Sequence, residues 1–167
     1  GTVGVKVPCF TERKDAIVSD ETKEIIEVTT YRTESAYTDK RRPSVVSFTT
    51  SLQEDLSRRD FTINALAYGK DTTGLWTLVD LFSGQKDLTQ RRIQTVGNPE
   101  ERFGEDALRL MRAVRLLTEL RDPQEKPSSE KWHLETKTEQ AIIALSENLR
   151  LISQERIRDE LSKIILS

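Results

Sequence analysis

In the N-terminal part of the chain, hydrophobic and polar residues alternate over short runs, which is typical of β-strands. Residues 2–7 alternate β-branched residues with small or polar ones, and residues 25–31 form a second run with strong β-propensity. Three shorter runs, at residues 44–50, 75–80 and 93–96, have the same character. Turn-rich polar segments separate these runs, so we expect a small β-sheet accompanied by short helices.

The segments between the expected strands are mostly polar. Residues 8–23 are turn-rich, and we expect them to form the arm of a long hairpin. Residues 32–43 are rich in charge and have no hydrophobic periodicity, so they are predicted to be a loop. Ser51 and Glu54 have the spacing of a capping box, which predicts a helix that starts there and leads into residues 58–68.

Helical periodicity replaces the strand pattern near Pro99. Residues 99–120 are predicted to form one long helix with a single apolar stripe, made of Ala107, Leu110, Met111, Val114 and Leu117. After a polar linker, an amphipathic helix is expected at residues 136–149 and a last helix from Ser153. The fold is therefore expected to be α+β, with a first domain at residues 1–97 and an all-helical domain at residues 98–167.

Composition narrows the classes of function. With 35% hydrophobic residues, 32% charged residues and a formal net charge of −2, a surface that binds nucleic acid has to be a local basic patch. The single cysteine, Cys9, and the single histidine, His133, exclude an internal disulfide and a His/Cys metal cluster. No apolar run approaches the roughly 18 residues of a membrane helix, so we expect no membrane contact and a cytoplasmic location.

A dense polar cluster adjoins an apolar run at residues 58–66, where Arg59, Asp60 and Asn64 lie close together. On a helix, Asp60 and Asn64 would lie one turn apart, so both could reach a sugar hydroxyl. Arg59 adds a cation suited to phosphate or sugar oxygens. The alternative is a network of salt bridges at the end of a helix, and the cluster alone does not decide between the two.

A second cluster contains Asp106 and Arg109, whose side chains would meet on one face of a helix. The simplest interpretation is a surface salt bridge worth about 0.3 kcal/mol. Cytosine and adenine, however, each present an amino donor beside a ring-nitrogen acceptor, whereas uracil and guanine present a carbonyl beside a ring N–H. A carboxylate that accepts from the amino group and a guanidinium that donates to the ring nitrogen would select C and A.

Both clusters belong to longer motifs. Residues 51–65, SLQEDLSRRDFTINA, resemble the ribose-binding motif of the class II tRNA nucleotidyltransferases, a family of CCA-adding enzymes and bacterial poly(A) polymerases. Residues 105–115, EDALRLMRAVR, are similar to the base-selecting motif of the same family. Further matches follow in the same order along nearly the whole chain, at residues 1–3, 27–32, 37–43, 80–84 and 152–158.

The resemblance implies an architecture of two parts. Residues 1–97 would be a partial nucleotidyltransferase head, built of a small β-sheet with helices, and residues 98–167 a helical neck that meets the tRNA acceptor end. In the head, the resemblance places Arg59, Asp60 and Asn64 against the ribose of the incoming nucleotide.

The same resemblance assigns roles in the neck and at its junction with the head. Asp106 and Arg109 would read the Watson–Crick edge of CTP or ATP, and Arg112 would lie near the triphosphate. A hinge-like motif between head and neck would contain Asp80, Gly84 and Asp87. A flexible loop that helps the site change from C to A addition would correspond to residues 31–43.

One motif of the family is missing. Its members carry an Asp-x-Asp pair that holds Mg²⁺ ions, which activate the primer 3′-hydroxyl and clamp the triphosphate. No Asp-x-Asp occurs in these 167 residues, and Gly1-Thr2-Val3 matches a strand just downstream of it. Glu27 is a candidate supporting carboxylate, but one carboxylate is a poor Mg²⁺ site. We therefore expect nucleotide binding without catalysis by this chain alone, the metal ligands lying outside it, for example on a separate chain.

Three functions remain open at this stage. The chain is part of a CCA-adding enzyme that adds C and A to the tRNA 3′ end from CTP and ATP, or part of a bacterial poly(A) polymerase. Alternatively, it is a non-catalytic module that binds RNA or nucleotide and has lost its metal site. The pair Ala107-Leu108 within the base-selecting motif favours the first function over the second.

Overall fold

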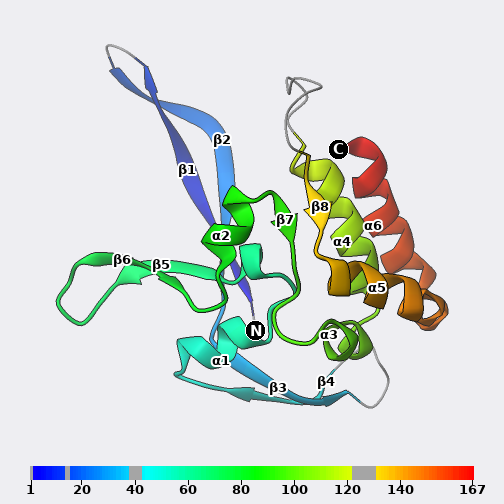
Figure 1. Ribbon diagram of the computed structural model, residues 1–167. Coiled ribbons are helices and arrows are strands. Elements are labelled where there is room, and N and C mark those ends of the chain that lie inside the picture. The colour runs from blue at the N-terminus through cyan, green and yellow to red at the C-terminus, as the bar shows by residue number, and fades with distance from the viewer. Residues whose placement is uncertain (1, 14–15, 38–42, 122–130) are drawn as a thin grey trace.

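The computed structural model describes residues 2–13, 16–37, 43–121 and 131–167, whose strands pair as four two-stranded ladders beside a group of helices (Figure 1). The α+β expectation is confirmed. Strands β1 (Val3–Arg13) and β2 (Ala16–Val28) form the long hairpin that the sequence predicts, with Val3 opposite Val28. Its register shifts between Pro8 and Cys9, as expected where proline cannot donate a ladder hydrogen bond.

A second hairpin corrects the expected loop at residues 32–43. Strand β3 (Arg32–Tyr37) pairs antiparallel with β4 (Pro43–Phe48), and Arg32 lies opposite Phe48. Backbone N–H and C=O groups make this pairing, so it does not require alternating apolar residues in the sequence. Residues 38–42 lie outside the described ranges.

Helix α1 (Leu52–Ser57) starts as its sequence predicts but ends earlier. The Ser51 hydroxyl accepts the backbone N–H of Glu54 at 3.3 Å. The Glu54 carboxylate accepts from the hydroxyl of Thr49 instead of reaching back to the backbone of Ser51, so only half of the capping box forms. The predicted continuation into residues 58–68 is wrong, because the chain leaves the helix at Arg58.

Contacts with a distant segment explain why α1 ends there. Asp60 O accepts the backbone N–H of Val96 at 3.0 Å, and the backbone N–H of Thr62 donates to Gln94 O at 2.9 Å. These bonds flank Phe61, whose extended conformation (φ −124°, ψ 148°) a continuing helix could not adopt. A short 3₁₀ turn, η1 (Thr62–Asn64), follows.

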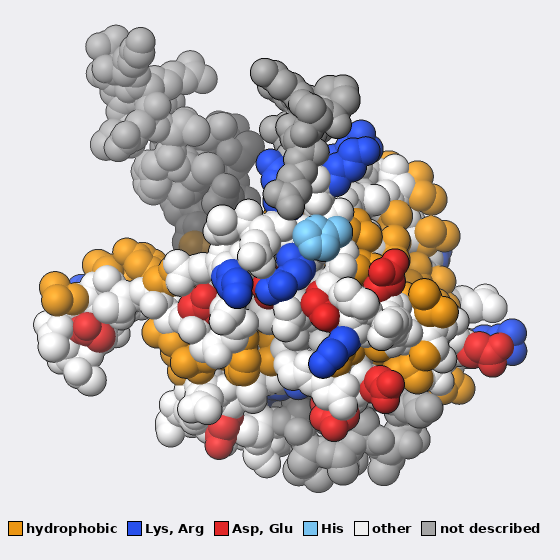
Figure 2. Space-filling model, viewed as in Figure 1, with side chains coloured by type: hydrophobic (Ala, Val, Ile, Leu, Met, Phe, Trp, Pro, Cys, Tyr) orange, Lys and Arg blue, Asp and Glu red, His pale blue; other side chains and the backbone are white. Residues whose placement is uncertain are grey.

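Two strands and a helix connect this turn to the rest of the chain. Strands β5 (Leu66–Lys70) and β6 (Trp76–Asp80) form a projecting hairpin, and helix α2 (Gly84–Thr89) follows it. Apolar side chains gather on this hairpin at the left of Figure 2, where Tyr68 stacks on Trp76 with 5.2 Å between ring centroids. The predicted strand at residues 93–96 is reduced to β7 (Arg92–Ile93), which pairs in parallel with β8 (His133–Leu134).

The long helix expected at residues 99–120 is two helices, α3 (Pro99–Glu105) and α4 (Leu108–Glu119). Asp106 breaks them apart with φ −146° and ψ 106°, and its carboxylate accepts the backbone N–H of Leu108 at 3.1 Å. A short acidic side chain that binds the backbone in this way competes with a continuous helix.

The buried stripe of α4 agrees with the predicted one except at Val114. Ala107 and Leu110 are buried as expected, and Met111 and Leu117 pack against the core, but Val114 is 41% exposed. Leu108, Ala113 and Leu116 are buried as well. Helix α6 (Gln154–Leu166) packs along α4 (Figure 1). The helix expected at residues 136–149 divides into α5 (Thr136–Leu145) and a 3₁₀ segment, η2 (Ser146–Leu151).

One hydrophobic core joins both parts of the chain. Phe61 and Ile93 from the first part and Phe103 from the second are each 0% exposed and belong to the same cluster. The division between residues 97 and 98 stays a prediction, because the core itself crosses it. None of the helices in the described ranges is long and apolar enough to span a bilayer.

Gly84 permits a close contact between α2 and η1, which suggests a stability test. A Cβ atom at Gly84 would lie 2.3 Å from the carbonyl oxygen of Thr62, so the backbone would have to move. We expect Gly84→Ala to lower the free energy of unfolding by about 1–3 kcal/mol in urea denaturation. Gly69→Ala is the matched control, because nothing lies within 4 Å of its Cβ position. Equal effects of the two substitutions would contradict this explanation.

Asp80 caps α2 in a way that depends on pH. Burial works to raise the pKa of Asp80, but hydrogen bonds from the backbone N–H groups of Gln85 and Gly84 outweigh it and hold the pKa below its ordinary value. A carboxyl group with a lowered pKa stabilises the fold above its unfolded-state pKa, and this contribution is lost as pH falls through the folded-state value.

We therefore expect Asp80→Ala to lower the free energy of unfolding by about 1 kcal/mol at pH 7. The difference from the wild type should shrink as the pH falls below about 3.9. Urea denaturation at a series of pH values measures it. A difference that stays constant down to low pH would show that the charge on Asp80 has no part in capping the helix.

Candidate functional site

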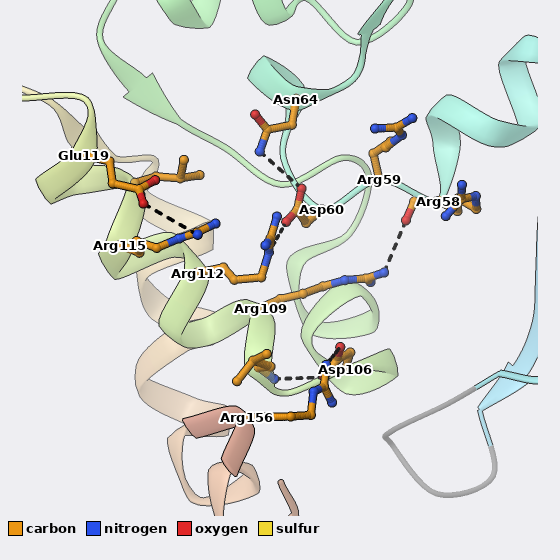
Figure 3. Close-up of a pocket in the computed structure, with 12 residues that line it drawn as sticks. Arg58, Arg59, Asp60, Asn64, Asp106, Arg109, Arg112, Arg115, Glu119 and Arg156 are labelled. Carbon is orange, nitrogen blue, oxygen red and sulfur yellow. Dashed lines mark hydrogen bonds and ion pairs between the residues drawn. The ribbon is translucent and has the colours of Figure 1, made fainter. Parts of the chain in front are cut away.

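A cleft of about 660 Å³ lies between the turn that follows α1 and the exposed side of α4. Figure 3 shows side chains from both walls pointing toward one another across it. The two polar clusters of the sequence, far apart along the chain, therefore meet in one place. The lining residues are Arg58, Arg59, Asp60, Asn64, Asp106, Leu108, Arg109, Arg112, Arg115, Leu116, Glu119 and Arg156.

The lining of the cleft is strongly basic. Six arginines face three carboxylates there, although the whole chain has a formal net charge of −2. This is the local basic patch that the sequence requires if the protein binds a nucleic acid or nucleotide. Guanidinium groups present planar N–H donors that match phosphate and carboxylate oxygens, so the cleft is suited to an anionic ligand.

Asp60 links the two walls of the cleft. Its carboxylate is 8% exposed, accepts the backbone N–H of Phe61 at 2.9 Å and binds Arg112 Nε at 2.6 Å. Asn64 Nδ2 lies 3.5 Å from the same carboxylate, which is a long contact. Asp60 and Asn64 thus lie together as the sequence predicts, although they are joined by a turn instead of a helix. Arg112 contacts Asp60 directly.

Asp55 is a buried support for this wall that the sequence analysis missed. It is 1% exposed and receives Arg58 Nη2 at 2.6 Å, Arg59 Nη2 at 3.2 Å and the backbone N–H of Arg32 at 3.3 Å. Burial works to raise the pKa of Asp55, but these hydrogen bonds outweigh it and hold the pKa below its ordinary value. The spacing of an acid three and four residues before two arginines was the available signal.

Arg109 is held from three directions on the opposite wall. Its Nη1 donates to Arg102 O at 2.9 Å and to the carboxylate of Glu105, and its Nη2 donates to Arg58 O at 3.2 Å. Glu105 also binds Arg102 Nη1 at 2.8 Å, and Arg102 Nη2 donates to Ser57 O at 2.9 Å. Neither Arg102 nor Glu105 was singled out as a partner of Arg109 from the sequence.

Asp106 does not pair with Arg109, so the expected salt bridge between them is absent. Instead, its carboxylate turns toward α6, where Arg156 Nη2 lies 2.7 Å from Oδ2 and Arg156 Nη1 lies 3.3 Å from Oδ1 (Figure 3). Both Asp106 and Arg109 still line the cleft. The helix break between α3 and α4 explains the difference, because the two side chains do not project from one continuous helix.

The residues of the hinge-like motif lie behind the cleft. Asp87 is 1% exposed, accepts the hydroxyl of Thr62 at 2.6 Å and binds Arg92 Nε at 2.8 Å. Gly84 touches the backbone of Thr62. These contacts fix the turn that carries Asp60 and Asn64, so this part of the structure is tightly packed.

Glu27 lies apart from the other candidates. It is exposed on β2, opposite Gly4, and it does not line the cleft. In the described part of the chain, no three His, Cys, Asp or Glu side chains are grouped so that they could hold a metal ion. The described residues therefore provide binding groups for an organic anion but no complete metal site.

Comparison with known proteins adds an independent line of evidence. The family described as "Poly A polymerase head domain" matches residues 3–94, and the family described as "Probable RNA and SrmB-binding site of polymerase A" matches residues 132–167. The CCA-adding enzyme of Lactobacillus helveticus (strain DPC 4571) is 53% identical over 141 residues, which cover 84% of this chain and 32% of that enzyme.

Solved structures agree with the sequence relatives. A Bacillus stearothermophilus CCA-adding enzyme in complex with CTP matches with a TM-score of 0.66 and 39% identity, covering 89% of this chain and 32% of that one. A Thermotoga maritima CCA-adding enzyme complexed with tRNA matches with a TM-score of 0.56 and 32% identity, covering 68% and 25%. The chain spans about a quarter to a third of the length of these relatives. By motif, fold and similarity, the chain belongs to the class II tRNA nucleotidyltransferase family.

Proposed function

We propose that this chain is part of a CCA-adding nucleotidyltransferase and that its cleft binds the incoming CTP or ATP. The main support for this proposal is that the two polar clusters, around Asp60 and around Arg109, line one basic cleft large enough for a nucleotide. The relatives named above are CCA-adding enzymes, one of them in complex with CTP and one with tRNA. The tRNA 3′ end is then the acceptor, which the helical part at residues 98–167 contacts in the cytoplasm.

Arg109 and Asp106 are proposed to read the base. A guanidinium has five N–H groups, and three of those of Arg109 are committed to Arg102, Glu105 and Arg58. The remaining N–H groups are available for the ring-nitrogen acceptor of cytosine or adenine. Asp106 accepts from the amino group, so uracil and guanine would bring a carbonyl against a carboxylate, and a buried mismatch of this kind is strongly disfavoured.

The wall formed by the turn that follows α1 is proposed to hold the sugar and the phosphates. Asp60 and Asn64 offer an acceptor and a donor close together, which suits ribose hydroxyls. The Arg59 side chain is 40% exposed and is held at one end by Asp55, so the exposed N–H groups at its tip can reach the ligand. Arg112 adds a cation next to the sugar site, where the triphosphate would run.

Transfer itself requires divalent metal, which we assign to carboxylates outside the described residues. Mg²⁺ activates the attacking hydroxyl and neutralises the triphosphate in reactions of this type. Glu27, exposed and distant from the lining of the cleft, is at most a supporting residue in a larger assembly. The Asp-x-Asp ligands would come from another segment or from a separate chain.

Supplying the missing motif in trans tests this function. The chain is mixed with an N-terminal segment of a CCA-adding relative that carries Asp-x-Asp, together with Mg²⁺, CTP, ATP and tRNA lacking its terminal CCA. We expect incorporation of CMP and AMP, read on sequencing gels. The same segment with both aspartates changed to alanine is the control. Long A tracts would indicate a poly(A) polymerase, and a stable complex without any product would indicate a non-catalytic binding module.

Arg109→Ala tests the base-reading role in the isolated chain. Loss of a donor to the ring nitrogen should reduce the ratio of CTP to UTP affinity by about tenfold or more, because one such base contact contributes about 1–3 kcal/mol of discrimination. Isothermal titration with each of the four nucleotides measures the ratio. Arg158→Ala is the matched control, because the Arg158 side chain is 72% exposed and pairs only with its neighbour Asp159. Equal losses for all four nucleotides would contradict the role.

A further inference from the structure

Three lining residues of the cleft lie outside the two sequence motifs, Leu116 and Glu119 of α4 and Arg156 of α6, and Arg156 comes from the most distant part of the chain. It makes a two-point contact with Asp106, from Nη2 to Oδ2 at 2.7 Å and from Nη1 to Oδ1 at 3.3 Å. Arg156 comes from 50 residues further along the chain, so no local pattern connects the pair. The carboxylate proposed to select the base is therefore positioned by another helix.

The contacts of Asp106 define what it can still bind. An ionised carboxylate has about four acceptor directions. Two of those on Oδ1 are used by the backbone N–H of Leu108 and by Arg156 Nη1, and one on Oδ2 is used by Arg156 Nη2. One acceptor direction on Oδ2 remains, which fits a single amino donor. The planar guanidinium also prevents the carboxylate from rotating, which a point charge would not do.

Helix α6 does not depend on this contact for its own position. Glu160 is 3% exposed on α6, and its carboxylate lies 2.9 Å from Arg115 Nε on α4. The hydroxyl of Ser167 also donates to Thr118 Oγ1 at 2.8 Å. Apolar packing of Ile157 against the core adds a further tie. Loss of the Arg156 side chain should therefore leave α6 packed on α4.

We infer that Arg156 is a positioning residue for base selection, which holds the Asp106 carboxylate with one acceptor directed at the amino group of cytosine or adenine. This inference rests on the proposed function. It makes a specific claim about selectivity: without Arg156, the carboxylate rotates, and cytosine and adenine lose the acceptor for the amino group that adjoins their ring nitrogen. Uracil and guanine bring a carbonyl against Asp106, so their affinity should not fall when this carboxylate is free to rotate.

Nucleotide titrations on variants of the chain test the inference. For Arg156→Ala we expect CTP and ATP affinities to fall by about tenfold, as is typical when the partner that orients a binding group is removed. UTP and GTP affinities should not fall by more than about twofold. Arg156→Lys keeps the charge but cannot make the planar two-point contact, so it should restore only part of the selectivity.

Two control variants separate positioning from general stability. Glu160→Gln weakens the other ion pair between α4 and α6 without touching Asp106, and Arg158→Ala removes an exposed arginine from the same helix. Both should keep the wild-type ratio of CTP to UTP affinity. Thermal melting of each variant shows whether it is folded, and Arg156→Lys supplies the measurement if Arg156→Ala does not fold.

The outcomes distinguish this inference from the proposed function. A wild-type chain that binds all four nucleotides equally, or none, overturns both. If the wild type is selective and folded Arg156→Ala keeps the full selectivity, the inference alone is overturned. If Arg156→Ala does not fold, full selectivity in Arg156→Lys overturns it in the same way. An equal loss of selectivity in Glu160→Gln would also overturn it, because the effect would then come from the packing of α6.

Discussion

The two walls of the cleft are joined by arginines that bind the last carbonyl groups of α1. Arg102 Nη2 donates to Ser57 O at 2.9 Å, and Arg109 Nη2 donates to Arg58 O at 3.2 Å. Carbonyls at the end of a helix have no partner within it and carry partial negative charge, so a cation is favourable there. Since Glu105 binds both guanidiniums, a single carboxylate orients both arginines toward the facing wall.

The interruption between α3 and α4 has a structural effect in the cleft. A continuous helix would direct Asp106 and Arg109 to one face, where they would neutralise each other. The extended conformation of Asp106 turns its side chain toward α6 and leaves Arg109 to the carbonyls of the facing wall. Each group is thus ordered by a different partner, and both remain accessible from the cleft.

Local patterns in the sequence predicted the elements that local interactions determine. The β1–β2 hairpin and the cap at Ser51 follow from alternation and side-chain spacing, and the motifs identified the cleft residues. The early end of α1 depends instead on bonds to residues 94–96, and the orientation of Asp106 depends on Arg156. Contacts between residues this far apart leave no periodic signal, so neither could be read from the sequence.

The shared core sets a condition on how the chain can be divided. Phe61, Ile93 and Phe103 pack in one cluster, and the parallel pairing of β7 with β8 ties residues 92–93 to residues 133–134. Separating the chain near residue 97 would expose these aromatic and aliphatic surfaces on both products. Residues on the two sides of position 97 are therefore expected to fold as one unit, and neither part is expected to fold when expressed without the other.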